Sequence, residues 1–168
     1  VILIHGQFIR PDQVQQLKPL GIFPSMFPMH TFYWGDWYKK IVDPETAAGI
    51  SPMRSILDTG LHATSHTDAP VALPNLMQVV WATVNRTSRS GAVIGANERV
   101  TALEAMKMIT LWGAEQFGEQ ASKGSLEPGK LADMVVLSDN PITIDPMKIN
   151  TIKVLQTIKE GKTVYTRK

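Results

Sequence analysis

The 168-residue sequence contains no cysteine. This absence excludes a disulfide framework and excludes zinc or iron–sulfur sites that are ligated by thiolates. Any metal site must therefore be built from histidine and carboxylate side chains. Long apolar runs are also missing, because none approaches the roughly 20 residues that a membrane-spanning helix needs. A membrane is therefore not an expected partner.

The sequence has little excess charge of either sign. It carries 17 Lys and Arg residues against 15 Asp and Glu residues, and the basic residues are scattered along the chain. A nucleic-acid-binding protein typically presents a clustered basic face, so nucleic acid is not an expected partner either. Hydrophobic residues make up 43% of the chain and charged residues 19%, which favours a folded core over disorder.

The first four residues, VILI, form a β-branched and aliphatic run that is typical of a strand buried on both faces of a parallel sheet. Neither an initiator methionine nor a signal-peptide pattern precedes this run. We therefore expect the chain to be a fragment or a processed product of a longer protein. Because any targeting segment would lie upstream, the sequence leaves the compartment open between cytoplasm and periplasm.

The first half of the chain alternates between strand and helix patterns, which is typical of βα units around a parallel sheet. The aromatic-rich segment 27–38 is predicted to be a long loop that follows the second strand. The predicted strands are 1–4, 21–26 and 61–65, and the predicted helices are 12–20, 53–58 and 74–86.

The second half changes in character. Thr101 and Glu104 form a capping box that predicts a helix ending near Gly118. Residues 127–130 (EPGK) predict a type II turn, in which Gly129 supplies the positive φ. The remaining strands, predicted at 131–137, 151–158 and 163–165, indicate an antiparallel sheet attached to the βα body.

Two residues with metal-binding side chains follow predicted strands. His5 follows the first strand and Asp68 follows the third, and functional residues gather at the carboxyl ends of strands in parallel βα folds. An imidazole and a carboxylate together suit zinc, iron or manganese. A divalent ion lowers the pKa of its bound water to about 7, and a neighbouring carboxylate can then move the proton.

Each of these residues also has a structural interpretation. A histidine at a strand end commonly makes a structural hydrogen bond, and Asp68 can form an Asx turn or cap a helix. His62 and His66 can share the face of Asp68 in an extended segment, although a supporting or loop role is favoured for both. His30 and Trp34, in the predicted loop, can line a substrate pocket or pack the loop onto the body.

Residues 124–137 (GSLEPGKLADMVVL) resemble a signature of the amidohydrolase superfamily. The helix at 101–118 and the segment 153–165 resemble the regions that flank this signature. Three further segments resemble the ends of barrel strands six, seven and eight in its amidohydrolase 3 branch, the YtcJ-like or AepA-like proteins: residues 4–7 (IHGQ), 27–30 (FPMH) and 65–71 (SHTDAPV).

The resemblance implies an α/β fold in two parts. Residues 1–118 would form the C-terminal part of a (β/α)8 TIM barrel, with strands six to eight and their helices. Residues 119–168 would form the C-terminal part of a small β-sandwich. The missing N-terminal part of the barrel would be the natural partner of this chain, and a homo-oligomer is the other expected assembly.

The resemblance also implies a reaction, the hydrolysis of a non-peptide, amide-like C–N bond in a small-molecule substrate by metal-activated water. His5 would be a metal ligand, and Asp68 would be both a ligand and the catalytic proton carrier. Zinc is the expected ion, with one or two ions in the complete enzyme and none required in this chain. Substrate contacts are expected, on weaker grounds, from His30, Trp34, His66 and Arg86.

Several family features are absent from this chain. The strand-one His-x-His pair, the strand-four lysine or acid and the strand-five histidine have no counterpart, and Phe27 stands where glutamine is usual. His66 and Thr67 stand where a glycine and a serine usually precede the aspartate. Because an unclosed barrel leaves exposed sheet edges, the chain alone is predicted to be inactive. The alternative is a non-catalytic, degenerate domain that binds a ligand or partner through its aromatic segment.

Overall fold

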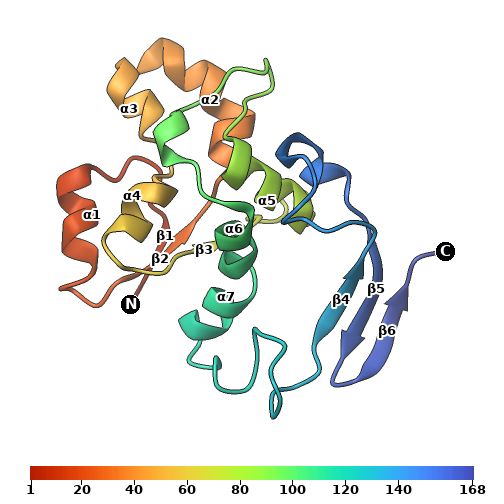
Figure 1. The fold of residues 1–168 in the computed structure, drawn as a ribbon. Helices are drawn as coiled ribbons and strands as arrows, with labels where there is room; N and C mark the ends of the chain where they lie inside the picture. The colour runs from red at the N-terminus through yellow and green to blue at the C-terminus, as the bar shows by residue number, and fades with distance from the viewer.

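The computed structural model describes all residues from 1 to 168. It contains one parallel and one antiparallel sheet, and each has three strands. The helices lie beside the parallel sheet (Figure 1). The predicted α/β class is therefore confirmed. The parallel sheet has the order β1 (Ile2–His5), β2 (Phe23–Met26) and β3 (Thr64–Ser65). The antiparallel sheet has the order β4 (Met134–Leu137), β5 (Val154–Lys159) and β6 (Lys162–Thr166).

Short helices connect these strands, and none is long and apolar enough to cross a bilayer. The helices predicted at 12–20, 53–58 and 74–86 are confirmed with small shifts of their ends. The α-helices are α1 (Pro11–Leu17), α2 (Met29–Ile41), α3 (Pro44–Ala48), α4 (Met53–Asp58), α5 (Leu76–Asn85), α6 (Ala102–Met108) and α7 (Leu111–Gln116). Two 3-10 helices, η1 (Ala96–Glu98) and η2 (Pro146–Thr151), complete the structure.

The prediction of a loop at 27–38 is wrong, because helix α2 occupies most of this segment. Aromatic residues have modest helix propensity, so packing and side-chain contacts have to stabilise this helix. Gly35 allows Ile94 to approach so closely that an added Cβ would lie 2.7 Å from its Cγ1. Asp36 accepts hydrogen bonds from the hydroxyls of Ser88 and Ser90, which fastens the connector after α5 onto α2.

Strand β1 agrees with the predicted position, but the prediction that it is buried on both faces is wrong. Ile2 is 38% exposed and Ile4 is 56% exposed. β1 lies at the edge of the sheet, where it pairs only with β2, and the face that carries these two side chains is only partly covered. All four residues of the apolar run are therefore of the buried type, although Ile2 and Ile4 are among those exposed in this chain.

The single helix predicted from Thr101 to Gly118 is also divided. α6 ends before Ile109, and α7 begins after Thr110. Two consecutive β-branched residues disfavour a helix, and the Thr110 hydroxyl donates to the carbonyl of Met106 at 2.8 Å. The capping box at the start of α6 is confirmed, since Thr101 and Glu104 bond each other's backbone amides.

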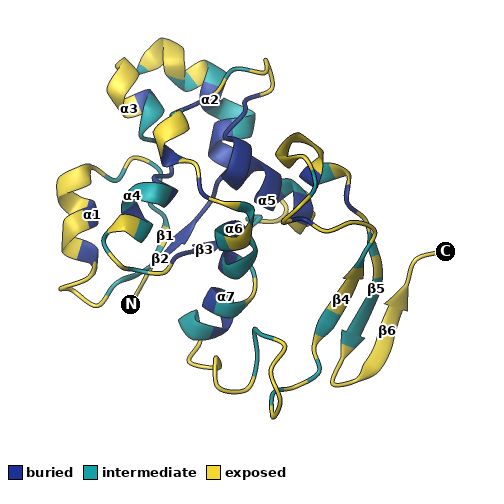
Figure 2. Cartoon of the chain, viewed as in Figure 1, coloured by how far each residue is buried: buried dark blue, intermediate teal, exposed yellow.

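The buried residues concentrate around α5 and the parallel sheet, whereas β6 is exposed along its length (Figure 2). The segment that includes η2 joins this core, because Ile149 and Ile152 are 0% and 4% exposed and belong to the same cluster as Val80. Two side chains of α5, Trp81 and Asn85, donate to backbone carbonyls of η2 at 3.1 and 2.8 Å. The predicted boundary at residues 118 and 119 stays a prediction.

The turn at 127–130 supports a test of local backbone conformation. Gly129 has a φ of +90°, and the Lys130 amide donates to the Glu127 carbonyl at 3.2 Å. No atom lies within 4 Å of an added Cβ, so a substitution here changes conformational strain without a steric clash. We expect Gly129→Val to lower the free energy of unfolding by about 1–2 kcal/mol. Thermal unfolding measures this loss. Gly129→Asn, which tolerates positive φ, is the control, and an unchanged melting temperature for the valine variant would contradict the prediction.

Candidate active site

Three of the four histidines of the chain gather at the carboxyl end of the parallel sheet. His5 is the last residue of β1, and His66 directly follows β3. His30 follows β2 as the second residue of α2. The parallel register aligns the three strand ends, since His5 pairs with Met26 and the His66 amide donates to the Met26 carbonyl at 3.0 Å.

Four side chains form a continuous hydrogen-bonded chain across this end of the sheet. Ser25 Oγ lies 3.1 Å from His66 Nδ1, and His66 Nε2 lies 3.0 Å from His5 Nδ1. The chain ends where His5 Nε2 lies 3.2 Å from Asp68 Oδ2. Each of the two imidazoles therefore uses both of its ring nitrogens, which fixes the orientation of both rings.

The hydrogen bonds that link Ser25, His66, His5 and Asp68 can be donated in either of two directions. In the first, the Ser25 hydroxyl donates to His66, His66 donates to His5, and His5 Nε2–H donates to Asp68. In the second, every donor is reversed, so His5 Nε2 keeps a lone pair that faces the Asp68 carboxylate. Two acceptors at this distance repel each other unless a proton or a metal cation lies between them. The second arrangement therefore creates a position for a cation.

The last two residues of this hydrogen-bonded series, His5 and Asp68, have strained backbones. His5 has a φ of 71° and Asp68 a φ of 51°, which place both in the left-handed region. For residues other than glycine this conformation costs roughly 1–3 kcal/mol each, and it often marks functional positions. The surrounding contacts hold both residues in conformations that neither would prefer alone.

Phe27 fills the centre of the site. Its ring centroid lies 5.7 Å from that of His5, 4.7 Å from His30 and 5.6 Å from His66, and the side chain is 1% exposed. Trp34 extends the aromatic surface, with its centroid 5.8 Å from that of His30. The residue that replaces the expected glutamine thus contacts all three imidazoles of the site.

His30 is the most enclosed of these imidazoles. Burial lowers the pKa of His30 to about 4, and repulsion by His5 and His66 adds to this effect, while Asp68 opposes it. Burial, followed by the charge of His5, also lowers the pKa of His66. His30 is therefore a neutral imidazole at physiological pH.

The structure thus brings together five of the predicted site residues, namely His5, His30, Trp34, His66 and Asp68. Arg86 lies apart from them. Its side chain is 0% exposed, and its guanidinium donates to four backbone carbonyls. This enclosure argues against the predicted contact of Arg86 with a substrate.

His62 also lies apart from the site. It precedes β3, stacks on Trp112 with ring centroids 4.6 Å apart, and places Nδ1 2.6 Å from Glu115 Oε2. Ser25 and Ser51 also belong to the site, although no pattern in the sequence predicts them. Ser51 Oγ lies 3.1 Å from His30 Nδ1 and donates to the Phe27 carbonyl at 3.2 Å.

The spacing of His5 and Asp68 can be compared with that of two ligands of a metal ion. The 3.2 Å between His5 Nε2 and Asp68 Oδ2 is close to the roughly 3.3 Å that separates two ligands of one tetrahedral zinc ion. However, no group of three His, Cys, Asp or Glu side chains is arranged to hold a metal ion. Because catalytic zinc sites use three protein ligands, the pair fits such an ion but does not complete its coordination.

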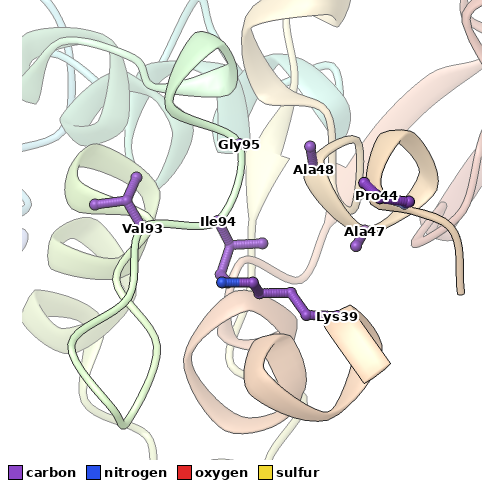
Figure 3. Close-up of a pocket in the computed structure, with 7 residues that line it drawn as sticks. All are labelled: Lys39, Pro44, Ala47, Ala48, Val93, Ile94 and Gly95. Carbon is purple, nitrogen blue, oxygen red and sulfur yellow. The ribbon is translucent and has the colours of Figure 1, made fainter. Parts of the chain in front are cut away.

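Two cavities of the structure lie away from all of these side chains. The first, of about 170 Å³, lies between α3, the end of α2 and the connector at 93–95 (Figure 3). Its lining is mostly apolar, with Lys39 as its single charged residue. The second, of about 490 Å³, lies between the end of β1 and helix α1.

Comparison with known proteins gives related sequences over almost the whole chain. A sequence model described as "Amidohydrolase family" matches residues 1–165. The N-substituted formamide deformylase of Arthrobacter pascens is 30% identical over 98% of this chain and 31% of its own length. The amidohydrolase YtcJ of Bacillus subtilis is 22% identical over 98% of the chain and 32% of its own length. The chain therefore spans about a third of the length of these relatives.

Solved structures with the same fold give a similar coverage. The guanine deaminase of E. coli matches with a TM-score of 0.70 and 18% identity, over 99% of this chain and 39% of that one. An adenosine deaminase from Xanthomonas campestris with bound zinc matches with a TM-score of 0.71 and 16% identity, over 98% of this chain and 37% of that one. At these identities the likeness extends to the fold alone.

Proposed function

Because the chain belongs to the amidohydrolase family, we propose that it is the C-terminal portion of a metal-dependent hydrolase that cleaves a non-peptide C–N bond. Residues 1–118 would supply strands six to eight of a (β/α)8 barrel, and residues 119–168 would supply part of a small β-sandwich. The observation that carries this proposal is the pair formed by His5 and Asp68, whose side chains lie 3.2 Å apart at the carboxyl end of the parallel sheet.

The unpaired edges of the parallel sheet are evidence for the proposed barrel. β1 and β3 are edge strands that each pair with one neighbour only, and a closed barrel would pair both of them on their free sides. Leu3 faces helix α1, so the exposed side chains of Ile2 and Ile4 point to the opposite face of β1, which a closed barrel would enclose. Further strands on both edges would cover these surfaces and bring the remaining metal ligands. A homo-oligomer stays a prediction.

In this mechanism His5 Nε2 and Asp68 Oδ2 would hold the divalent ion, for which zinc is expected. When bound, the ion supplies a hydroxide nucleophile at neutral pH. In the arrangement that leaves room for the ion, His5 Nδ1–H would donate to His66 Nε2 and His66 Nδ1–H to Ser25 Oγ, which would leave the lone pair of His5 Nε2 free to bind it. The Asp68 carboxylate would accept a proton from the attacking water and pass it to the leaving nitrogen as the C–N bond breaks.

The aromatic side of the site would bind the substrate. Trp34, which is half-buried, lies beside the neutral imidazole of His30, and the enclosed ring of Phe27 supports both. Such a surface suits a small molecule that carries both an apolar group and a hydrogen-bonding group. We therefore keep His30, Trp34 and His66 as proposed substrate contacts.

Zinc binding tests this proposal without any need for a substrate. In a calorimetric titration of the purified chain with zinc, we expect Asp68→Asn to weaken binding at least tenfold, since even the outer partners of metal ligands contribute about 10–100-fold. His62→Asn is the matched control, because it removes an imidazole that lies outside the site. Equal zinc affinities for the two variants would contradict the assignment of Asp68 as a ligand.

A non-catalytic domain that binds a ligand or partner is the second candidate function. The observation that favours it is the lack of any three-ligand group within the chain. The upstream sequence of the gene product separates the two candidates. A His-x-His pair near its start supports hydrolysis, and its absence supports the binding domain.

A further inference from the structure

We propose that Ser51 is a positioning residue that holds His30 in the tautomer with a proton on Nδ1 and a free lone pair on Nε2. The tautomer itself follows from the contacts of Ser51. Its use on a substrate rests on the proposed function. Neither the sequence pattern nor the family resemblance singled out Ser51, which lies in the turn between α3 and α4.

The hydroxyl of Ser51 determines the position of the proton. Ser51 Oγ lies 3.2 Å from the carbonyl oxygen of Phe27, which can only accept a hydrogen bond. The single hydroxyl proton therefore points to Phe27, because two oxygen lone pairs would otherwise face each other. Towards His30 Nδ1, at 3.1 Å, Ser51 Oγ can then only accept. Nδ1 must carry the proton of the neutral ring.

The other nitrogen of His30 is left available. His30 Nε2 makes no hydrogen bond within the chain and is not among the fully enclosed unpartnered atoms, of which Gln7 Nε2 is the single case. The His30 ring lies edge-on to that of His5, with centroids 5.7 Å apart. His30 thus presents an acceptor in the site, which fits a substrate that carries an N–H or O–H donor.

A buried arginine fixes the backbone of Ser51. Ser51 has a φ of 48°, a left-handed conformation that is costly for serine. Arg86 Nη1 donates to the Ser51 carbonyl at 2.9 Å, and Nη2 donates to the Ile50 carbonyl at 2.6 Å. The Ser51 amide donates to the Gln7 carbonyl at 2.9 Å. These bonds hold the hydroxyl between Phe27 and His30 with little freedom to move.

Nuclear magnetic resonance of the ¹⁵N-labelled chain tests this inference directly, because two-bond ¹H–¹⁵N correlations distinguish a protonated from an unprotonated ring nitrogen. The His30 signals are assigned with the variant His30→Gln. At neutral pH we expect a protonated Nδ1 and an unprotonated Nε2 for His30. In Ser51→Ala we expect this pattern to be lost in favour of a protonated Nε2.

Two further variants make the result specific. Ser51→Gly also removes the hydroxyl but accepts the left-handed φ, so it keeps the test valid if the alanine variant does not fold. Ser25→Ala is the matched control, because it removes the hydroxyl beside His66 and leaves the His30 signals unchanged. A protonated Nε2 in the wild-type chain, or the wild-type pattern in the folded Ser51 variants, would overturn the inference. Zinc and turnover play no part in the measurement, so its failure is distinguishable from failure of the proposed function.

Discussion

Asp68→Asn is expected to abolish turnover in a protein that carries the complete barrel. The substitution removes one metal ligand and the carboxylate that accepts the proton, and proton transfer alone contributes typically about 10²–10⁴-fold to the rate. The fold should survive, because the Asp68 side chain is 36% exposed and asparagine, like aspartate, tolerates a left-handed φ such as the 51° of this position. The measurement is kcat/KM together with circular dichroism of the variant.

Asp58→Asn is a suitable control for this experiment. Asp58 is the last residue of α4, and its side chain is 64% exposed and lies 3.5 Å from that of Arg54, outside the site. This variant should retain wild-type activity. Turnover at the wild-type rate in Asp68→Asn would refute the role of Asp68, whatever the behaviour of the control.

Gly95→Ala is expected to cause a large loss of stability. An added Cβ would lie 1.9 Å from the carbonyl oxygen of Ala48, and that oxygen also accepts a hydrogen bond from Arg86 Nη2. Gly95 and Ala48 lie side by side in the lining of the small cavity (Figure 3). Overpacking of about 1–3 kcal/mol adds to a left-handed strain of about 1–2 kcal/mol. Urea unfolding should therefore show a loss of about 2–5 kcal/mol.

Gly91→Ala separates the two causes of this loss. Gly91 has a φ of +87°, but nothing lies within 4 Å of an added Cβ, so only the conformational strain remains. We expect a loss of about 1–2 kcal/mol in this variant. If the two alanine variants lose the same free energy of unfolding, the loss in Gly95→Ala comes from backbone strain alone, and the clash with Ala48 plays no part in it.

The features that depend on neighbouring residues could be predicted from the sequence. The capping box of Thr101 and Glu104 and the positive φ of Gly129 are examples, because a few adjacent side chains determine each of them. The meeting of His5 and Asp68 was also predictable, since parallel strands end at one edge of their sheet. Their functional roles stay predictions.

The features that depend on distant contacts could not be predicted. Helix α2 forms in an aromatic-rich segment, where contacts with the connector after α5, such as those of Gly35, compensate for a modest propensity. Arg86 is predicted to contact substrate, but its guanidinium donates to the carbonyl of Ile94 and to carbonyls of segment 48–51, which lies far from it in the sequence. Ser51 has no local signal at all, because its two partners lie 21 and 24 residues away.

The packing of η2 on α5 has a consequence for how the chain unfolds. The hydrogen bonds from Trp81 and Asn85, and the burial of Ile149 and Ile152, join a segment between β4 and β5 to the core that supports the histidines. Local opening of η2 would therefore expose part of that core to water. Residues of the two sheets should exchange their amide hydrogens through a shared cooperative unit, rather than through two independent ones.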